Sequence, residues 1–178
     1  MIIIKSEEEI DLMRISGKVT GTILRDLADF IKPGISTADI DRFVETTIRD
    51  HGMIPTFKGY GGFPASACVS INEEVVHGIP SKDRIIKEGD IVSVDVGSTY
   101  KGYVSDAART YAVGEISKEA QHLIDATRAS FFAGLEFCKV GYRLSDISHA
   151  IQKSAEGEGF SVIRDFVGHG VGQQMHED

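Results

Sequence analysis

Two aspartates near the middle of the sequence, Asp95 and Asp106, have the spacing of residues on the two arms of one β-hairpin. The predicted hairpin has strands over 90–97 and 103–111 and a turn over 98–102. With the turn centred between Tyr100 and Lys101, Asp95 is expected directly opposite Asp106. The two Cβ atoms would then lie roughly 5 Å apart on one face of the hairpin. The sequence therefore predicts a close pair of carboxylates.

Two like charges opposed in a β-ladder destabilise it unless something offsets their repulsion. A shared proton would do so, and so would a bound cation, of which a divalent metal ion is the more specific interpretation. The alternative is a solvated hairpin in which Lys101 or Arg109 screens the acids, because exposed charges are common and interact weakly in water.

His169 lies between Gly168 and Gly170, so its imidazole has no bulky neighbour along the chain and can approach a ligand. A lone histidine is more often structural, since liganded or perturbed side chains are the minority. Together with Asp95 and Asp106, however, it forms a mixed carboxylate and imidazole set. Such a set suits Mn, Fe, Co or Zn better than Ca, which prefers oxygen donors alone.

Predicted helices and short strands surround these residues. Ser6 and Glu9 form a capping box at the start of a helix that ends at Pro33-Gly34. Further helices are predicted from about 37 to 52, from an N-cap at Ser117 to about 139, and from about 145 to 157. A short strand is predicted over 67–71, with a candidate partner over 75–77, after a glycine and aromatic loop over 56–64.

The chain also repeats itself, because a shift of 107 residues superposes identical residues at more positions than chance predicts. The matched pairs are Thr20 with Thr127, Phe30 with Phe137, Lys32 with Lys139, Gly34 with Gly141, Asp39 with Asp146, Ile40 with Ile147, and Gly52 with Gly159. Each copy reads as helix, turn, helix and then a glycine-rich loop, at 58–62 and at 167–171. The first copy continues into the aspartate hairpin, whereas the second stops at Asp178. We therefore expect a two-half architecture whose second half is incomplete.

Composition is that of an ordinary soluble globular domain of 178 residues, with 42% hydrophobic and 26% charged residues. The formal net charge of −8 argues against binding of a nucleic-acid backbone as the main task. The apolar start, Met1 to Ile4, is broken at once by Lys5, and it predicts neither a signal peptide nor a membrane span. Two cysteines, Cys68 and Cys138, without a CxxC motif, predict the reducing cytoplasm as the compartment.

Several spaced motifs point to one family. In chain order they are Val75-Val-His-Gly-Ile-Pro80, Val94-Asp-Val-Gly97, Gly102-Tyr-Val-Ser-Asp-Ala-Ala-Arg-Thr110 and Phe166-Val-Gly-His-Gly-Val-Gly172. They resemble the motifs of the type I methionine aminopeptidases, and the resemblance covers all 178 residues. It implies the pita-bread fold, an α+β structure with a pseudo-twofold repeat, over a single but incomplete aminopeptidase domain from 1 to 178.

The resemblance implies a dinuclear metal site made of two aspartates, one histidine and two glutamates. Asp95, Asp106 and His169 match three of these ligands, with Asp106 in the bridging position. The two glutamates of the family follow a His-Glu-Asp segment, with which this chain ends, so it offers three of five ligands. Neither Glu158 nor Glu177 matches a missing position. The implied cofactors are two divalent ions, of Co, Mn, Fe or Zn.

The same resemblance assigns two more histidines to catalysis and to substrate binding. Cleavage of an N-terminal peptide bond needs a nucleophile at neutral pH, which a metal-bound water supplies, as well as oxyanion donors and a proton for the leaving amine. His77 resembles the family histidine near the scissile amide nitrogen, and His176 the one near the carbonyl oxygen. The alternative for His77 is a polar residue at the end of an edge strand.

Recognition of methionine needs a narrow apolar pocket, because such a pocket discriminates by shape at roughly 1 to 3 kcal/mol per methylene. The residues that match the family's pocket lining are Tyr60, Phe63, Cys68 and Met175. Met175 stands where relatives commonly carry an aromatic residue. Cys68 is equally typical of a buried strand cysteine. It is not a credible nucleophile, because Ala67 and Val69 beside it supply neither a base nor a cation.

We therefore expect an enzyme that removes initiator methionine from nascent chains or short peptides with an N-terminal Met. The alternatives are a non-catalytic pita-bread module that binds peptide or ribosome, an inactive fragment, and a proline-specific relative of the prolidase type, which usually has an additional N-terminal domain. No nucleic-acid or membrane partner is expected. For the 178-residue chain itself, the missing ligands and an exposed sheet edge predict weak metal binding, little or no methionine release, and either self-association along that edge or marginal folding.

Overall fold

The computed structural model describes residues 2–178, and these residues form two compact units. Unit 1 consists of the chain up to Ile116 together with His169–Asp178, and unit 2 consists of Ser117–Gly168. All the residues that the sequence proposes for chemistry lie in unit 1. None of the helices within residues 2–178 is long and apolar enough to cross a membrane.

Two helices with predicted starts begin unit 1. α1 spans Glu7–Phe30, and the side chains of Ser6 and Glu9 each accept a hydrogen bond from the other residue's backbone N–H. The predicted capping box is therefore confirmed. α2 spans Thr37–Asp50 and has an equivalent box at its N-cap, Ser36. It starts where the sequence predicts and ends two residues before the predicted end.

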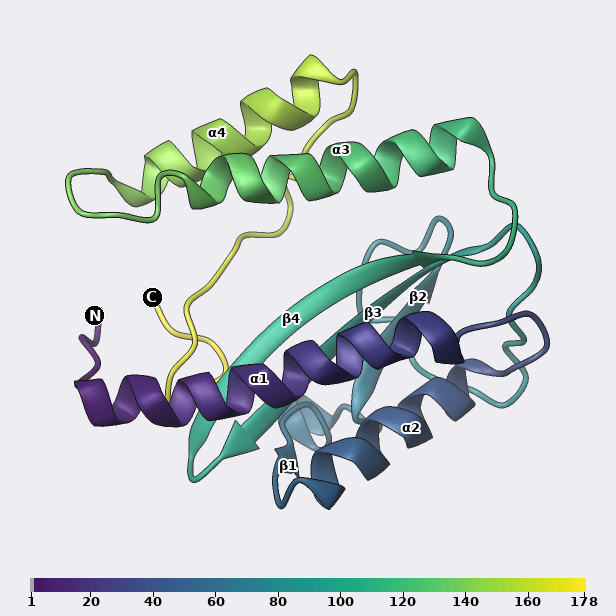
Figure 1. Cartoon of the computed structure of the whole chain (residues 1–178), viewed down its shortest axis with the longest axis horizontal. Helices are drawn as coiled ribbons and strands as arrows, with labels where there is room; N and C mark the ends of the chain where they lie inside the picture. Colours follow the sequence, from purple (N-terminus) through teal and green to yellow (C-terminus); the bar gives the residue numbers. More distant parts are fainter. Residues whose placement is uncertain (1) are drawn as a thin grey trace. The chain divides into compact units, whose positions relative to one another are not determined.

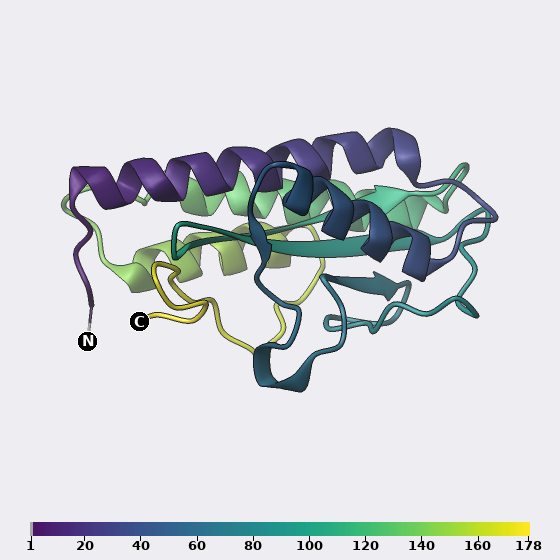
Figure 2. The same cartoon turned by 90° about the horizontal axis from the view of Figure 1, so that it is seen from below.

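An antiparallel sheet follows, with β3 (Ile91–Tyr100) at its centre. β4 (Tyr103–Ala112) pairs with one edge of β3 along its whole length, while β1 (Ile54–Pro55) and β2 (Ala67–Ile71) share the other edge. In Figure 1, α1 lies along β4, and Figure 2 shows α1 above the strands. The sequence predicts β2 correctly. It also predicts a strand over 75–77, which is wrong, since no strand of the described chain lies between β2 and β3.

The hairpin turn is shorter than the sequence predicts. Tyr100 and Tyr103 are paired, so the loop consists of Lys101 and Gly102 alone. Both loop residues have positive φ, 47° and 86°, as a type I′ turn requires. Residues 98–100, which the sequence assigns to the turn, therefore belong to β3. The twist of a type I′ turn matches that of the flanking strands, so the strands stay paired up to the turn.

This turn changes the register of the two aspartates. Asp95 pairs with Ala108, and Asp106 pairs with Gly97. The expected direct opposition of the two acids is therefore wrong, and they are diagonal neighbours. Because the register differs from the predicted one by two residues, both side chains still lie on the same face of the sheet.

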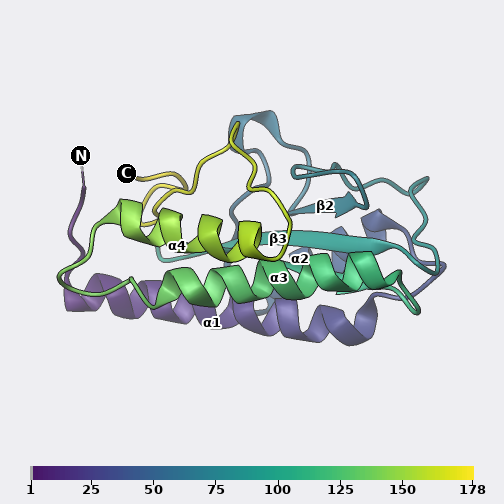
Figure 3. The same cartoon turned by 90° about the horizontal axis from the view of Figure 1, so that it is seen from above.

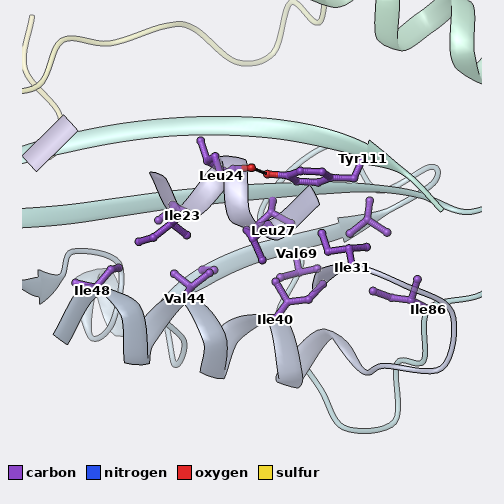
Figure 4. Packing of buried hydrophobic residues seen from close by; sticks show 14 of the residues in the cluster. Ile23, Leu24, Leu27, Ile31, Ile40, Val44, Ile48, Val69, Ile86 and Tyr111 are labelled. Carbon is purple, nitrogen blue, oxygen red and sulfur yellow. Dashed lines mark hydrogen bonds between the residues drawn. The ribbon is translucent and has the colours of Figure 1, made fainter. Parts of the chain in front are cut away.

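The core of unit 1 lies between the two helices and the sheet (Figure 4). Leu27 of α1 and Ile40 of α2 are fully buried, as is Val69 of β2. Each buried aliphatic side chain contributes about 1.5 to 3 kcal/mol. The hydroxyl group of Tyr111, on β4, donates to the Leu24 carbonyl oxygen of α1 and joins the same layer. The helices therefore cover one face of the sheet and leave the other for different contacts.

Four hydroxyl groups are buried where α1 lies against the hairpin. They belong to Ser16, Thr20, Ser98 and Ser105, and none of these residues is more than 8% exposed. Ser98 and Ser105 are paired across β3 and β4, with their Oγ atoms 3.1 Å apart. Each also lies within 3.0 Å of the Ser16 and Thr20 hydroxyls. This hydroxyl tetrad therefore satisfies its own hydrogen bonds inside the core.

Unit 2 is an antiparallel pair of helices, which Figures 1 and 3 show side by side. α3 spans Lys118–Leu135 after the predicted N-cap at Ser117, and it ends before the predicted residue 139. α4 spans Leu144–Gly157, close to the prediction. The two helices approach closely at Gly134, where a Cβ atom would lie 2.6 Å from Cγ1 of Ile151.

Candidate functional site

Residue alternation along the strands sets the surroundings of the two aspartates. Val94 pairs with the buried Val69 of β2 on the face covered by the helices. Asp95 and its β2 partner Cys68 therefore point to the opposite face. Asp106 lies on that same face and shares a hydrogen bond with Asp95. The structure thus brings the two carboxylates together, in a diagonal arrangement.

Both acids are in an environment that disfavours two negative charges. Burial raises the pKa of Asp95 to about 7, and the charge of Asp106 adds to this effect. Burial also raises the pKa of Asp106, although the hydrogen bond from Asp95 and the charge of His169 oppose it. The Asp106 side chain is 14% exposed. Near neutral pH the pair is therefore stable only with a shared proton or a neighbouring cation.

His169 directs one ring nitrogen at this pair. Its Nε2 atom is 3.6 Å from Oδ2 of Asp106, and its Nδ1 atom is 3.0 Å from the Gly170 carbonyl oxygen. A carbonyl oxygen only accepts, so Nδ1 carries the hydrogen and Nε2 of the neutral ring carries a lone pair. A lone pair that faces a carboxylate oxygen is repelled by it. A proton on Nε2, or a cation between the two atoms, makes the contact favourable.

The donor set fits a divalent metal ion, although it does not enclose one. Two ligands that each lie about 2.0–2.2 Å from a shared ion stand roughly 3 to 3.6 Å apart. The distance from Nε2 of His169 to Oδ2 of Asp106, 3.6 Å, is of this size. Within residues 2–178, no group of three or more His, Cys, Asp or Glu side chains is arranged to hold an ion by itself. The carboxylates and the imidazole therefore form an open arrangement.

His77 lies in the irregular loop between β2 and β3 and has a positive φ of 61°. The next residue is held against β2, since the Gly78 carbonyl oxygen accepts from Val69 N at 2.9 Å and Gly78 N donates to Oγ of Ser70 at 3.1 Å. A Cβ atom on Gly78 would lie 2.1 Å from the Val69 carbonyl oxygen, so only glycine fits. The charge of His77 opposes the raised pKa of Asp95, and the two residues are therefore within electrostatic reach.

A narrow loop near the end of the described chain brings His169 and His176 together. Gly170 and Glu177 form an antiparallel bridge with N···O distances of 2.8 and 2.9 Å. The two imidazole rings have centroids 4.3 Å apart. The hydroxyl oxygen of Tyr60, in the 3-10 turn η1 (Tyr60–Gly62), is 2.8 Å from Nδ1 of His176. This loop, which spans 169–178, is called the histidine loop below.

Tyr60 and Cys68, two of the predicted pocket residues, lie beside the histidines and the acids. The Tyr60 hydroxyl is hydrogen-bonded to Nδ1 of His176. Burial, followed by the charge of Asp95, raises the pKa of the Cys68 thiol to about 12. The thiol therefore stays protonated and is a poor nucleophile. Phe63, directly after η1, and Met175, in the histidine loop, are half-buried.

A polar network that the sequence analysis did not find holds the histidine loop. Nζ of Lys5 lies 2.5 Å from Oε2 of Glu177. The hydroxyl of Tyr103 donates to Oε1 of Glu9 at 2.6 Å and accepts from Nε2 of Gln173 at 2.9 Å. The contact of Lys5 with Glu177 joins residues 172 positions apart, so no local pattern could have predicted it.

Comparison with known proteins finds relatives along the chain. The family model for metallopeptidase family M24 matches residues 11–178. The chain is 58% identical to the methionine aminopeptidase of Clostridium acetobutylicum and 51% identical to methionine aminopeptidase 1 of Bacillus subtilis. Each alignment covers 100% of this chain and 71% of the relative.

The structure shows the same relationship. It matches the crystal structure of the methionine aminopeptidase from Thermotoga maritima with a TM-score of 0.98 and 47% sequence identity. The match covers 100% of this chain and 72% of that chain. The α+β pita-bread fold that the sequence motifs imply is therefore confirmed.

Proposed function

The chain belongs to metallopeptidase family M24, and from this premise we propose that it removes the N-terminal methionine from nascent or short peptides. The observation that carries the proposal is the buried pair of Asp95 and Asp106, with Nε2 of His169 3.6 Å from the Asp106 carboxylate. A metal-dependent hydrolase uses such an arrangement. A binding module has no use for it, because two neighbouring buried acids destabilise the fold unless they share a proton or hold a cation.

The proposed cofactors are two divalent ions of the Co, Mn, Fe or Zn type. Asp95, Asp106 and His169 would hold them, with Asp106 shared, because carboxylate oxygens and an imidazole nitrogen are donors that these ions accept. When bound, such ions supply a water of lowered pKa and polarise the peptide carbonyl.

His77 and His176 act, in this proposal, on the peptide itself. His77 donates a hydrogen bond to the scissile amide nitrogen, which needs a proton to leave as an amine. Its backbone, with a φ of 61°, and the Gly78 contacts to β2 limit its movement. His176 stabilises the carbonyl oxygen as negative charge develops there. Since Tyr60 engages Nδ1 of His176, Nε2 is the atom left for the substrate.

The methionine side chain would enter a pocket lined by Tyr60, Phe63, Cys68 and Met175. Aromatic faces and polarisable sulfur make favourable contacts with a thioether. The protonated Cys68 thiol adds no charge to this lining. Shape then provides the selectivity, at roughly 1 to 3 kcal/mol per mismatched methylene.

The reducing cytoplasm is the compartment that we infer. Cys68 and Cys138 are both unpaired thiols, the first buried and the second exposed. Such thiols suit a compartment in which disulfides do not form. Binding to the ribosome stays a prediction.

The test of the proposed function uses the purified 178-residue chain, a Met-Ala-Ser peptide and a titration with Co²⁺ or Mn²⁺. We expect slow, metal-dependent release of methionine, because an open set of donors holds an ion less tightly than a closed one. Asp106→Asn should abolish this release. The matched control, Asp11→Asn, changes an acid on α1 whose side chain is 75% exposed, and it should have no effect.

Two results would contradict the proposed function. One is methionine release that survives Asp106→Asn at every metal concentration. The other is a chain that demonstrably binds the metal and the peptide but releases no methionine.

A further inference from the structure

One partly buried ion pair outside the proposed catalytic groups joins the start of unit 1 to its end. Lys5 precedes α1, Glu177 follows His176, and the Nζ and Oε2 atoms of the pair are 2.5 Å apart. The Lys5 side chain is 15% exposed and the Glu177 side chain is 7% exposed. At this burial neither charge is well solvated alone, so removal of one partner leaves the other uncompensated.

The Glu177 side chain and backbone also shape the histidine loop. Oε1 accepts from Gln174 N at 3.2 Å, and the backbone forms both hydrogen bonds of the bridge to Gly170. The packing around the carboxylate is tight. A Cβ atom on Gly172 would lie 2.3 Å from Oε1 of Glu177 and 2.5 Å from Cε of Lys5. A side chain there would have to displace the Glu177 carboxylate or the end of the Lys5 side chain, so the loop closes around the ion pair.

The bridge determines where the two imidazoles lie. Each histidine directly precedes one of the two bridged residues, and the rings of His169 and His176 have centroids 4.3 Å apart. Val104 N donates to the Gly172 carbonyl oxygen at 2.8 Å. This bond attaches the histidine loop to β4, the strand that carries Asp106.

We propose that Lys5 and Glu177 are positioning residues for both histidines. In this proposal neither residue contacts the substrate or a metal ion. The ion pair holds the histidine loop so that His169 faces Asp106 and His176 stays beside it. The consequence for catalysis rests on the proposed function, whereas the positioning itself does not.

Three variants and one control separate this role from general stability. Glu177→Gln keeps the shape of the side chain and the acceptor for Gln174, and it removes the charge. Lys5→Met removes the other charge, and the double variant leaves no unpaired charge. The matched control is Arg14→Met, which breaks an exposed ion pair with Asp11 on α1, where the N···O distance is 3.7 Å.

The first readout is ¹H–¹³C NMR of the histidine Cε1–H groups in the metal-free chain, which requires no peptidase activity. Each single variant should shift and broaden the signals of His169 and His176 and leave those of His51 and His122 unchanged. Arg14→Met should move none of them. The second readout is binding of Co²⁺ alone, which each single variant should weaken about 10- to 100-fold, as is typical for groups that orient metal ligands.

Unchanged His169 and His176 signals with unchanged Co²⁺ affinity would overturn the proposal, and so would an equal response to Arg14→Met. If circular dichroism shows that a single variant is unfolded, the double variant decides. In the double variant, displaced His169 and His176 signals support the proposal, and signals at their original positions overturn the proposal. Absence of methionine release from an unmodified chain that binds the metal and the peptide would refute the proposed function, and the histidine signals would still decide the positioning role.

Discussion

α2 and α4 occupy equivalent positions in the repeat but have different surroundings. α4 begins and ends 107 positions after α2, and each helix has 14 residues and an aspartate in its first turn that accepts from the backbone N–H of the N-cap residue. α2 buries Thr37, Ile40, Val44 and Ile48, whereas no residue of α4 is buried. α2 packs against β2, and α4 packs against α3. Local sequence therefore suffices to form the helix, and the element beneath it decides how much apolar surface the helix buries.

The first helices of the two copies show the same contrast. α1 buries six residues, from Ser16 to Leu27, whereas α3 buries three, all small: Ala126, Ser130 and Gly134. Unit 2 leaves large apolar side chains in contact with solvent, such as Phe131 at 59% and Leu144 at 77% exposed. Because apolar burial supplies most of the stability of packed helices, we expect unit 2 to open more readily than unit 1.

The matched isoleucines of the repeat should give the largest difference. Ile40 is fully buried, and its counterpart Ile147 is half-buried. Ile40→Ala should lower the free energy of unfolding by about 2 to 5 kcal/mol, because it leaves a cavity in the core. Ile147→Ala should lower it by about 1 kcal/mol or less. Urea unfolding followed by circular dichroism measures both, and equal losses would contradict the contrast between the two units.

The acid pair should make the stability of unit 1 depend on pH. The pKa of Asp95 is about 7 in the folded chain, against about 4 in an unfolded one. Between these values the folded state binds more protons, so the contribution of this group is most favourable below about pH 4 and falls as the pH rises towards 7.

In the metal-free chain this loss should reach about 3 kcal/mol between pH 4 and pH 7. The Asp95→Asn variant cannot ionise at this position, so it should not show this loss of stability. Urea unfolding of both proteins in the presence of a chelator, at several pH values, gives the comparison. NMR signals from α4 in unit 2 should not follow the trend. Parallel curves for the two proteins would show that the acid pair carries no such pH dependence.

Two helical glycines should give smaller changes of opposite sign. A Cβ atom built on Gly17 of α1 meets nothing within 4 Å, whereas on Gly134 of α3 it would lie 2.6 Å from Cγ1 of Ile151. Gly134→Ala should destabilise the chain by about 1 to 3 kcal/mol through overpacking. Gly17→Ala should stabilise it by about 0.5 to 1 kcal/mol, since alanine is the better helix former. Thermal unfolding tests both, and changes of the same sign would be inconsistent with this packing.

Features that depend on neighbours in the sequence can be predicted well. The capping box at Ser6, the start of α2 at Thr37 and the bounds of β2 all agree with the sequence analysis. The side-chain period of two also places Asp95 and Asp106 on one face correctly. In each case the deciding interactions lie within a few residues.

Features that depend on backbone conformation or distant contacts escape such reasoning. The expected opposition of the two acids fails because positive φ at Lys101 and Gly102 sets the turn. The strand expected over 75–77 is absent because Gly78 is held against β2 as part of an irregular loop. The ion pair of Lys5 with Glu177 spans 172 positions, and neither residue carries a local signal of its partner.

The hydroxyl tetrad adds information that the alternation of polar and apolar residues lacks. A slip of the hairpin by two residues keeps every side chain on its own face, so alternation alone cannot tell the observed register from the slipped one. The tetrad distinguishes the two registers, because the slip would place Ser98 opposite Tyr103 and not opposite Ser105. The hydroxyl groups of Ser16 and Thr20 would then lack hydrogen-bond partners in the core. A hairpin in the slipped register is therefore destabilised when α1 packs against it, because hydroxyl groups are buried without hydrogen bonds. Docking of the first helix acts as a proofreading step for the strands that carry the two acids.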